Sequence, residues 1–435
     1  MNALKSERDY DLRIKDRTLA RIRIEDGAFE SAASAVWADA ENAHLMPFGL
    51  QLTNEGIWRW LKDRALPYKR RFSEAICRSL GFDVNDTEAI YRAGLGLSLN
   101  DCYWLPPHRS ALRFEDVTPY ENEFSEALAQ VALDGSSDAP GHGLTPELTT
   151  DGTLPKAWRI EADGTRVLYK GATPGYRPGE PVSEALASSI ADAMGIDHAH
   201  YSLRVLGGQT YSVCANFTTT EVSYVPYAVA AGGHRKLSDA LAYAWLIGDE
   251  QLEKLCDMLA FDCVICNNDR HFANFGFMRD NGKGKIVGMA PVFDNGRGLF
   301  PSASDATAED LEQEARLTRP SFGGSSFEEL CSRVMGARQR DALATLGREG
   351  FQVPDGIGER GEQVREFAMK RAQGLSNLPM ADQVEFMKAV RHHAEELTGC
   401  RQGAWQPKAE HCPKVTPERE REIPCPEERR KRRTG

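Results

Sequence analysis

Polar side chains gather in residues 267–274, which read N-N-D-R-H-F-A-N and follow a stretch with the apolar spacing of a helix. Asp269 offers a carboxylate that can accept or orient a proton. Asn274, five residues later, offers an amide oxygen that can bind a metal ion. Several such groups in one short stretch indicate a site that does chemistry.

A second acidic group returns to this loop through a predicted hairpin. Residues 275–278 and 285–289 have the composition of short strands, and D-N-G-K-G near their junction is a hairpin signal. The second strand leads into V-F-D-N-G, where Asp294 can face Asn274. Carboxylate and amide oxygens, completed by water and phosphate oxygens, are the ligands that Mg²⁺ prefers at a nucleotide. The alternative is a polar hairpin with turn-forming Asn and Asp, but two matching elements in this order favour a magnesium site.

The run N-N-D-R-H-F-A-N-F-G-F, followed by P-V-F-D, resembles the HipA-like kinases. These bacterial, toxin-type Ser/Thr kinases have a fold that is a diverged relative of the protein and lipid kinases, whose catalytic loops share the D-x-x-x-x-N spacing. The resemblance implies that Asp269 is the catalytic base and that Asn274 and Asp294 bind Mg²⁺. It also implies that ATP is the cosubstrate.

Residues 149–170 have the pattern of a loop followed by two strands joined at a turn. The chain has no G-x-x-x-x-G-K-[ST] motif, which disfavours a P-loop NTPase. The loop holds one glycine and lacks the G-x-G-x-x-G of ordinary protein kinases, but it resembles the HipA-like version, in which Ser or Thr is followed by Gly and then Lys. The resemblance implies that Gly152 and Lys156 lie in a phosphate-binding loop and that Lys170 is the ATP-binding lysine.

The same loop holds three threonines that are candidates for autophosphorylation. The resemblance places Thr149 near the position where family members autophosphorylate, and Thr150 and Thr153 are the alternates. The other interpretation is that these side chains make turn hydrogen bonds to nearby backbone.

A helix is predicted to begin at Ser183, with Glu184 in its first turn. In kinases a helix glutamate pairs with the ATP-binding lysine and orients it, which makes Glu184 a cofactor-binding candidate. A glutamate in a first turn is also what the helix dipole favours, and both interpretations stay open at this point.

Composition limits the classes of protein that fit. The net charge of −11 argues against general nucleic-acid binding. No run of 18 apolar residues and no secretory leader is seen, so the sequence predicts a cytoplasmic protein without a membrane span. The ten cysteines are scattered, and Cys263 and Cys266 fall on an apolar helix stripe, which predicts packing in the core and not a zinc site.

The predicted fold class is α+β: a bilobal, diverged protein-kinase-like (HipA-like) fold with a mixed N-lobe and a helical C-lobe. The predicted regions are 1–105 with a small hairpin and helices, 106–217 as the N-lobe, 218–400 as the C-lobe, and 401–435 as a charged, disordered tail. Two helices within residues 53–80 could form a helix-turn-helix, but a packing role is favoured over DNA reading because such pairs are common.

The sequence therefore predicts an ATP- and Mg²⁺-dependent phosphotransferase that can autophosphorylate. A protein Ser/Thr acceptor and an antitoxin-like partner are implied by the resemblance alone. One alternative is a kinase of related fold that acts on a lipid or small molecule. Another is a nucleotide-binding regulator without transfer activity in a toxin–antitoxin-like complex, but the presence of Lys170, Asp269, Asn274 and Asp294 together argues against it.

Overall fold

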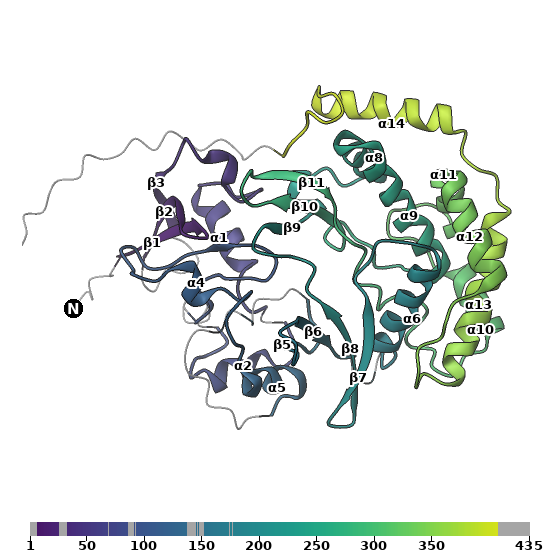
Figure 1. The fold of residues 1–435 in the computed structure, drawn as a ribbon, viewed down its shortest axis with the longest axis horizontal. Coiled ribbons are helices and arrows are strands. Elements are labelled where there is room, and N and C mark those ends of the chain that lie inside the picture. The colour runs from purple at the N-terminus through teal and green to yellow at the C-terminus, as the bar shows by residue number, and fades with distance from the viewer. Residues whose placement is uncertain are drawn as a thin grey trace, which may run out of the picture.

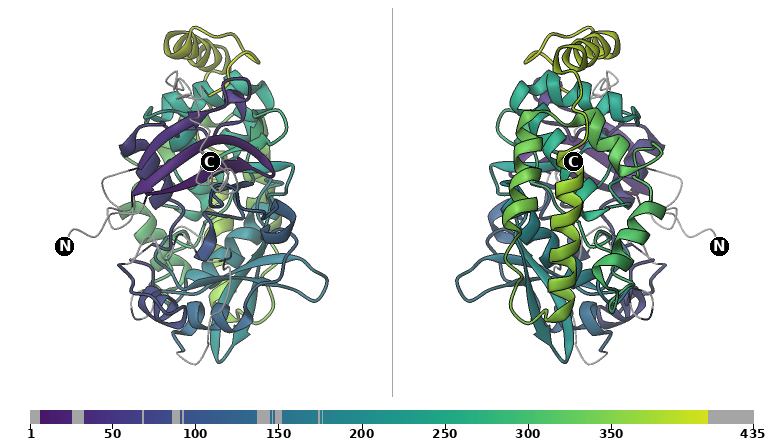
Figure 2. Two further views of the ribbon diagram at one scale, coloured as in Figure 1. Left: turned by 90° about the vertical axis from the view of Figure 1, so that its left-hand side faces the viewer. Right: turned by 90° about the vertical axis from the view of Figure 1, so that its right-hand side faces the viewer.

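The computed structural model describes residues 7–25, 33–67, 69–85, 91, 93–136, 145, 147, 152–173, 175 and 177–407. Three antiparallel sheets and a large group of helices make up this part of the chain (Figure 1). The α+β class is confirmed, with sheets concentrated on one side and helices α9–α13 on the other (Figures 1 and 2).

The first sheet is built from the N-terminal region and has the strand order β3-β2-β1-β4. Its strands are β1 (Glu7–Ile14), β2 (Arg17–Glu25), β3 (Ala33–Ala38) and β4 (Tyr103–Trp104). Tyr10, Leu12 and Ile14 alternate along β1 and are buried, as the period of a strand requires. The predicted opening hairpin is therefore one part of a larger sheet, closed by a strand about ninety residues further along the chain.

The second sheet has the order β5-β6-β8-β7 and carries both predicted phosphate-binding lysines. Its strands are β5 (Lys156–Ile160), β6 (Arg166–Lys170), β7 (Tyr201–Leu206) and β8 (Gln209–Ala215), and α6 (Glu180–Ala193) connects β6 to β7. The smaller elements around the first two sheets are η1 (Ala43–Leu45), α1 (Asn54–Lys62), α2 (Ser73–Ser79), α4 (Phe114–Val117) and α5 (Glu126–Asp134).

The third sheet, β11-β10-β9, joins the helical part of the chain to the rest. Its strands are β9 (Val222–Pro226), β10 (Gly276–Asp280) and β11 (Lys285–Met289). The helices are α7 (Tyr227–Ala230), α8 (Leu237–Ile247), α9 (Asp249–Ile265), α10 (Ala308–Leu317), α11 (Phe327–Val334), α12 (Ala337–Glu349), α13 (Glu359–Ser376) and α14 (Gln383–Thr398). The β10–β11 pair is the hairpin expected after the Asn267–Asn274 loop.

The N-terminal region is packed onto the rest of the chain. Ile76 and Cys77 of α2 share a hydrophobic cluster with α5 and with strands of the second sheet. Arg64 donates to the carbonyl of Gly96, and Arg70 donates to the carbonyl of Lys156. These contacts favour the packing role over DNA reading for residues 53–80. α2 therefore packs against elements of the predicted N-lobe, across the predicted boundary at residue 105.

The predicted start of the disordered tail is wrong. Gln402 donates to the carbonyl of Trp245, and the backbone N–H of Ile286 donates to Gln406 at 2.7 Å. The buried ring of Trp405 lies 4.6 Å from that of Tyr243. Burial of a large aromatic ring stabilises this stretch against α8, so residues 401–407 are part of the folded protein. The rest of the predicted tail, residues 408–435, lies outside the described residues.

Cys263 and Cys266 are buried in the main hydrophobic core, in agreement with the prediction from their helical spacing. Among the described helices, none has the length and apolar character that crossing a membrane requires.

Candidate functional site

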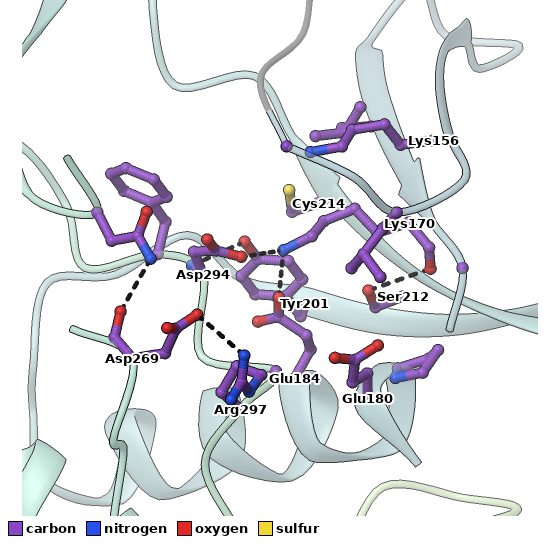
Figure 3. A pocket seen from close by; sticks show the side chains of 18 of the residues that line it. Lys156, Lys170, Glu180, Glu184, Tyr201, Ser212, Cys214, Asp269, Asp294 and Arg297 are labelled. Atoms are coloured by element: carbon purple, nitrogen blue, oxygen red, sulfur yellow. Dashed lines mark hydrogen bonds and ion pairs between the residues drawn. The ribbon is translucent and has the colours of Figure 1, made fainter. Parts of the chain in front are cut away.

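A cleft of about 490 Å³ lies where the second sheet, α6, the Asn267–Asn274 loop and the segment after β11 meet. Lys156 and Lys170 enter it from the sheet, and Asp269 enters it from the opposite side (Figure 3). Asp294 lies between them, next to Lys170 (Figure 3). The structure therefore brings the predicted catalytic and cofactor-binding residues into one cavity.

Lys170, at the end of β6, is held between two carboxylates (Figure 3). Its ammonium group donates to Glu184 on α6 and to Asp294, where the Nζ–Oδ1 distance is 2.6 Å. The second oxygen of Glu184 accepts the backbone N–H of Asn295 at 3.0 Å. Glu184 thus links the sheet, α6 and the segment after β11.

The three groups shift one another's pKa values. Burial alone would lower the pKa of Lys170, but Asp294 and Glu184 raise it well above its ordinary value. Burial alone would raise the pKa of Asp294, but Lys170 and Lys156 hold it well below its ordinary value. Burial raises the pKa of Glu184, against the opposing effect of Lys170. At neutral pH Lys170 is therefore a fixed positive charge inside the cleft.

Glu184 reaches this position because its helix begins earlier than predicted. α6 starts at Glu180, with Pro181 in the first turn, and Ser183 is buried inside the helix and does not cap it. Glu184 therefore lies beyond the first residues of the helix, and its carboxylate points to Lys170. Its observed pairing supports the lysine-orienting interpretation over the helix-dipole one.

Asp294 adopts a left-handed backbone conformation with φ 58°, which non-glycine residues rarely take. Its N–H donates to the hydroxyl of Tyr201 at 3.3 Å, and the carboxylate keeps 39% of its surface exposed to the cleft. The turn directs the next N–H, that of Asn295, toward Glu184. Backbone strain of this kind is typical of sites where a side chain must be held in one direction.

The Asn267–Asn274 loop closes on itself through its own amides. The N–H of Asp269 donates to the Oδ1 of Asn267 at 3.0 Å. The Nδ2 of Asn274 donates to the carbonyl of Asp269 at 3.1 Å, which leaves Oδ1 as the ligand atom that Asn274 can offer. The carboxylate of Asp269 is 38% exposed and lies 3.6 Å from the guanidinium of Arg297.

Lys156 and Lys170 are direct cross-strand partners in the β5–β6 pair, so their side chains leave the sheet on one face. Gly152 lies over Lys156 with φ 92°, and a Cβ at that glycine would be 2.8 Å from the Lys156 Nζ. Gly152 and Thr153 both line the cleft. The other two threonine candidates, at positions 149 and 150, lie outside the described residues.

Residues 148–349 match the family model of the HipA-like C-terminal domain. This part of the chain is a HipA-like C-terminal domain. The serine/threonine-protein kinase CtkA of Helicobacter pylori is 26% identical in an alignment 145 residues long, which covers 30% of this chain and 43% of that protein. The alignment thus spans less than half the length of this curated relative.

Two solved structures are also similar to the chain. The crystal structure of the Helicobacter pylori proinflammatory kinase CtkA has a TM-score of 0.42 and 18% identity, covering 57% of this chain and 94% of that one. HipA from Shewanella oneidensis, in a complex of the toxin–antitoxin system HipA and HipB with operator DNA, has a TM-score of 0.48 and 15% identity, covering 90% and 97%.

Within the HipA-like domain, Arg270 is a residue to which the sequence patterns assigned no role. Its side chain is 1% exposed and donates to both carboxylate oxygens of Asp262 on α9, each at 3.0 Å. It also donates to the carbonyls of Asn274 and Phe293 and to the Oδ1 of Asn295. Arg270 therefore ties the Asn267–Asn274 loop to the segment that carries Asp294.

The cleft of the HipA-like domain has an apolar end formed by aromatic rings. Phe217, Tyr224 and Phe293 pack with ring centroids 5.3 to 5.8 Å apart, and all three line the cleft. Cys214 and Ala215, at the end of β8, lie alongside them. A flat heterocycle fits such a surface, because stacking and burial both favour it. The predicted N-lobe, residues 106–217, ends at this point.

Proposed function

We propose that the chain is an ATP-dependent phosphotransferase, and specifically a HipA-like Ser/Thr protein kinase. The observation that carries this proposal is the position of Lys170 between Glu184 and Asp294, across one cleft from Asp269. A lysine oriented by a helix glutamate, with two carboxylates and an amide beyond it, is the arrangement that phosphoryl transfer needs.

ATP would lie along the cleft with its base against Phe217, Tyr224 and Phe293 and its phosphates near the two lysines. Lys170 would bind the phosphates by charge, and its carboxylate partners hold its ammonium group in place before the nucleotide arrives. Lys156 adds a second positive charge beneath the Gly152 turn. Phosphate oxygens thus meet cations that are already positioned.

The donor set of the cleft also fits Mg²⁺. The free amide oxygen of Asn274 and the carboxylate of Asp294 are hard oxygen ligands of the kind this ion prefers. A bound Mg²⁺ would neutralise charge on the phosphate oxygens of ATP. Replacing Asp294 with Asn should remove the added thermal stability that ATP·Mg²⁺ gives over ATP alone, and equal stabilisation of both proteins would exclude Asp294 as a ligand.

Asp269 would orient the acceptor hydroxyl and take its proton. The hydroxyl oxygen forms a bond to the γ-phosphorus as the bond from that phosphorus to the β,γ-bridging oxygen breaks, and ADP leaves. Arg297 holds the Asp269 carboxylate from the opposite side at 3.6 Å. Both groups remain about one-third exposed to the cleft, so an incoming hydroxyl can reach the carboxylate.

Autophosphorylation in the Gly152 loop is part of this proposal. Thr153 is exposed and lines the cleft, and Thr149 is the preferred acceptor from the family resemblance. A phosphate there would add close to two negative charges in a loop that lies against ATP. This charge should repel the nucleotide and lower activity. An antitoxin-like partner stays a prediction from the resemblance.

Incubation of the chain with ATP·Mg²⁺, followed by intact mass and phosphosite mapping, tests the function. We expect phosphate on the wild type, on a loop threonine, and none on Asp269→Asn. The matched control is Asp341→Asn, an exposed aspartate of α12 far along the chain from the cleft residues, which should behave as the wild type. Two results would contradict the proposal. One is phosphate on Asp269→Asn at the wild-type level. The other is that no phosphate is found on the wild type, on any variant or on any protein tested as an acceptor.

A further inference from the structure

We propose that Asp192, His198 and His200 bind one transition-metal ion of the Zn²⁺ class, outside the nucleotide cleft. Asp192 is near the end of α6, and both histidines lie in the segment just before β7. One ligand atom from each residue lies within 4.8 Å of the others. This site is independent of the proposed kinase activity.

The distances are close to those of a tetrahedral ion. The Oδ1 of Asp192 lies 3.5 Å from the Nδ1 of His200 and 3.9 Å from the Nε2 of His198. Bonds of 2.0–2.1 Å to a tetrahedral zinc ion separate the ligand atoms by about 3.4 Å. Small rotations of the exposed Asp192 and His200 side chains are enough to complete the site.

His198 is already arranged as a metal ligand. Its ring is 1% exposed, and the Nδ1–H donates to the carbonyl of Ile196 at 2.8 Å. Metal-bound histidines almost always donate their second ring nitrogen to such a group, which fixes the ring and leaves Nε2 as the electron-pair donor. Asp192 and His200 are 57% and 74% exposed, so an ion can enter from solvent and keep a water as its fourth ligand.

Ser188 competes with the ion for His198. Its hydroxyl lies 2.9 Å from Nε2 and accepts the N–H of Tyr201 at 3.0 Å. Metal binding would replace the contact between Ser188 and His198 and leave the hydrogen bond between Ser188 and Tyr201. Glu184, Ser188 and Asp192 are four residues apart on α6, so they share one face of the helix. An ion would therefore tie the far end of the helix that carries Glu184 to the strand that carries Tyr201.

The donor set selects the class of metal. Two imidazole nitrogens and one carboxylate suit Zn²⁺, Co²⁺, Ni²⁺ and Cu²⁺, whereas Mg²⁺ prefers oxygen ligands only. The site should thus be insensitive to millimolar Mg²⁺, which separates it from the nucleotide-linked metal site.

The proposal is tested on the full chain without a tag, kept reduced and first treated with a chelator. Zinc binding is then measured with ZnCl₂ alone, by titration calorimetry and by thermal shift. We expect the chain to bind one equivalent of zinc tightly and its melting temperature to rise. Loss of a direct ligand in His200→Ala should weaken binding by at least about 100-fold, more than loss of an outer-shell partner does. The matched control is His392→Ala, an equally exposed histidine of α14 beside Glu396, which should retain the site.

A Co²⁺ absorption spectrum provides the second measurement. It is needed because Cys412 and Cys425 also occur in the sequence, and their thiolates could bind the ion in place of the proposed site. Nitrogen and oxygen ligands give visible d–d bands without a thiolate charge-transfer band, and His200→Ala should lose those bands. The proposal is overturned if the wild type binds no ion, if His200→Ala binds zinc as tightly as the wild type, or if the bound Co²⁺ shows thiolate charge transfer.

Discussion

Replacing Arg270 with Met should lower the free energy of unfolding by about 3–5 kcal/mol, because the change leaves Asp262 as an unpaired charge in the core. The two side chains are 1% and 2% exposed, so water does not reach the carboxylate in the folded protein. Burial raises the pKa of Asp262 against the opposing effect of Arg270, so the environment disfavours the free carboxylate.

The remaining contacts of Arg270 set the size of this loss. In the variant, three oxygen atoms lose Arg270 as their hydrogen-bond donor. They are the carbonyls of Asn274 and Phe293 and the Oδ1 of Asn295, which lie 3.0, 2.6 and 2.5 Å from the guanidinium nitrogens. Each orphaned acceptor can cost about 1–3 kcal/mol, although such losses are not additive and overlap with the carboxylate. A domain is stable by about 5–15 kcal/mol, so the variant should lose a large share of its stability.

Urea unfolding under reducing conditions measures the change. The matched control is Arg297→Met, which breaks a 3.6 Å ion pair between groups that are 33% and 38% exposed, and it should cost less than about 1 kcal/mol. The double variant Arg270→Met/Asp262→Leu removes both charges and should recover part of the loss. Equal stabilities for Arg270→Met and Arg297→Met, or a double variant that recovers nothing, would refute the reasoning.

Three further predictions follow from the geometry. Lys170→Met should slow phosphoryl transfer by about 100-fold or more, measured with labelled ATP, because it removes a positioned cation from the phosphates; an unchanged rate would count against it. Gly152→Ala should weaken ATP binding in a calorimetric titration, because the added methyl group crowds the ammonium group of Lys156 beneath the turn. The control is Gly164→Ala, where φ is 88° and no atom lies within 4 Å of the added methyl group, and it should leave ATP binding unchanged. Burial would raise the pKa of Glu328, but Arg371 lowers it below 4.5. This pair therefore contributes stability above pH 4.5 that is lost as the pH falls further. Thermal unfolding should show Glu328→Gln to be less stable than the wild type at pH 7, and the difference in melting temperature between the two proteins should narrow below pH 4.5.

The placement of Asp269, Asn274 and Asp294 in one cleft could be predicted because the signals are local. Asp269 and Asn274 are five residues apart, and the hairpin that returns Asp294 is only fourteen residues long from the start of β10 to the end of β11. A turn motif and two short strands fix such a geometry with little help from the rest of the chain.

Three other features of the structure were not predicted from the sequence. The partner of Arg270 is on the preceding helix, and a buried guanidinium cannot be told from a solvated one by its sequence neighbours. The early start of α6 did have a local signal in Pro181, since proline is favoured in the first turn. Trp405 was likewise a signal within the predicted tail, because a large ring in a polar stretch needs a place to pack.

The N-terminal region also takes part in shaping the cleft. Arg70 donates to the carbonyl of Lys156, and the N–H of Arg71 donates to the carbonyl of Thr153 at 3.0 Å. These two contacts hold the residues that follow Gly152 from a segment about eighty residues earlier in the chain. The N–H groups and side chains that would meet the phosphates are therefore positioned by the sheet on one side and by the α1–α2 connection on the other. A ligand or partner that moved the α1–α2 connection would displace the proposed phosphate-binding loop directly, without having to act through Lys170.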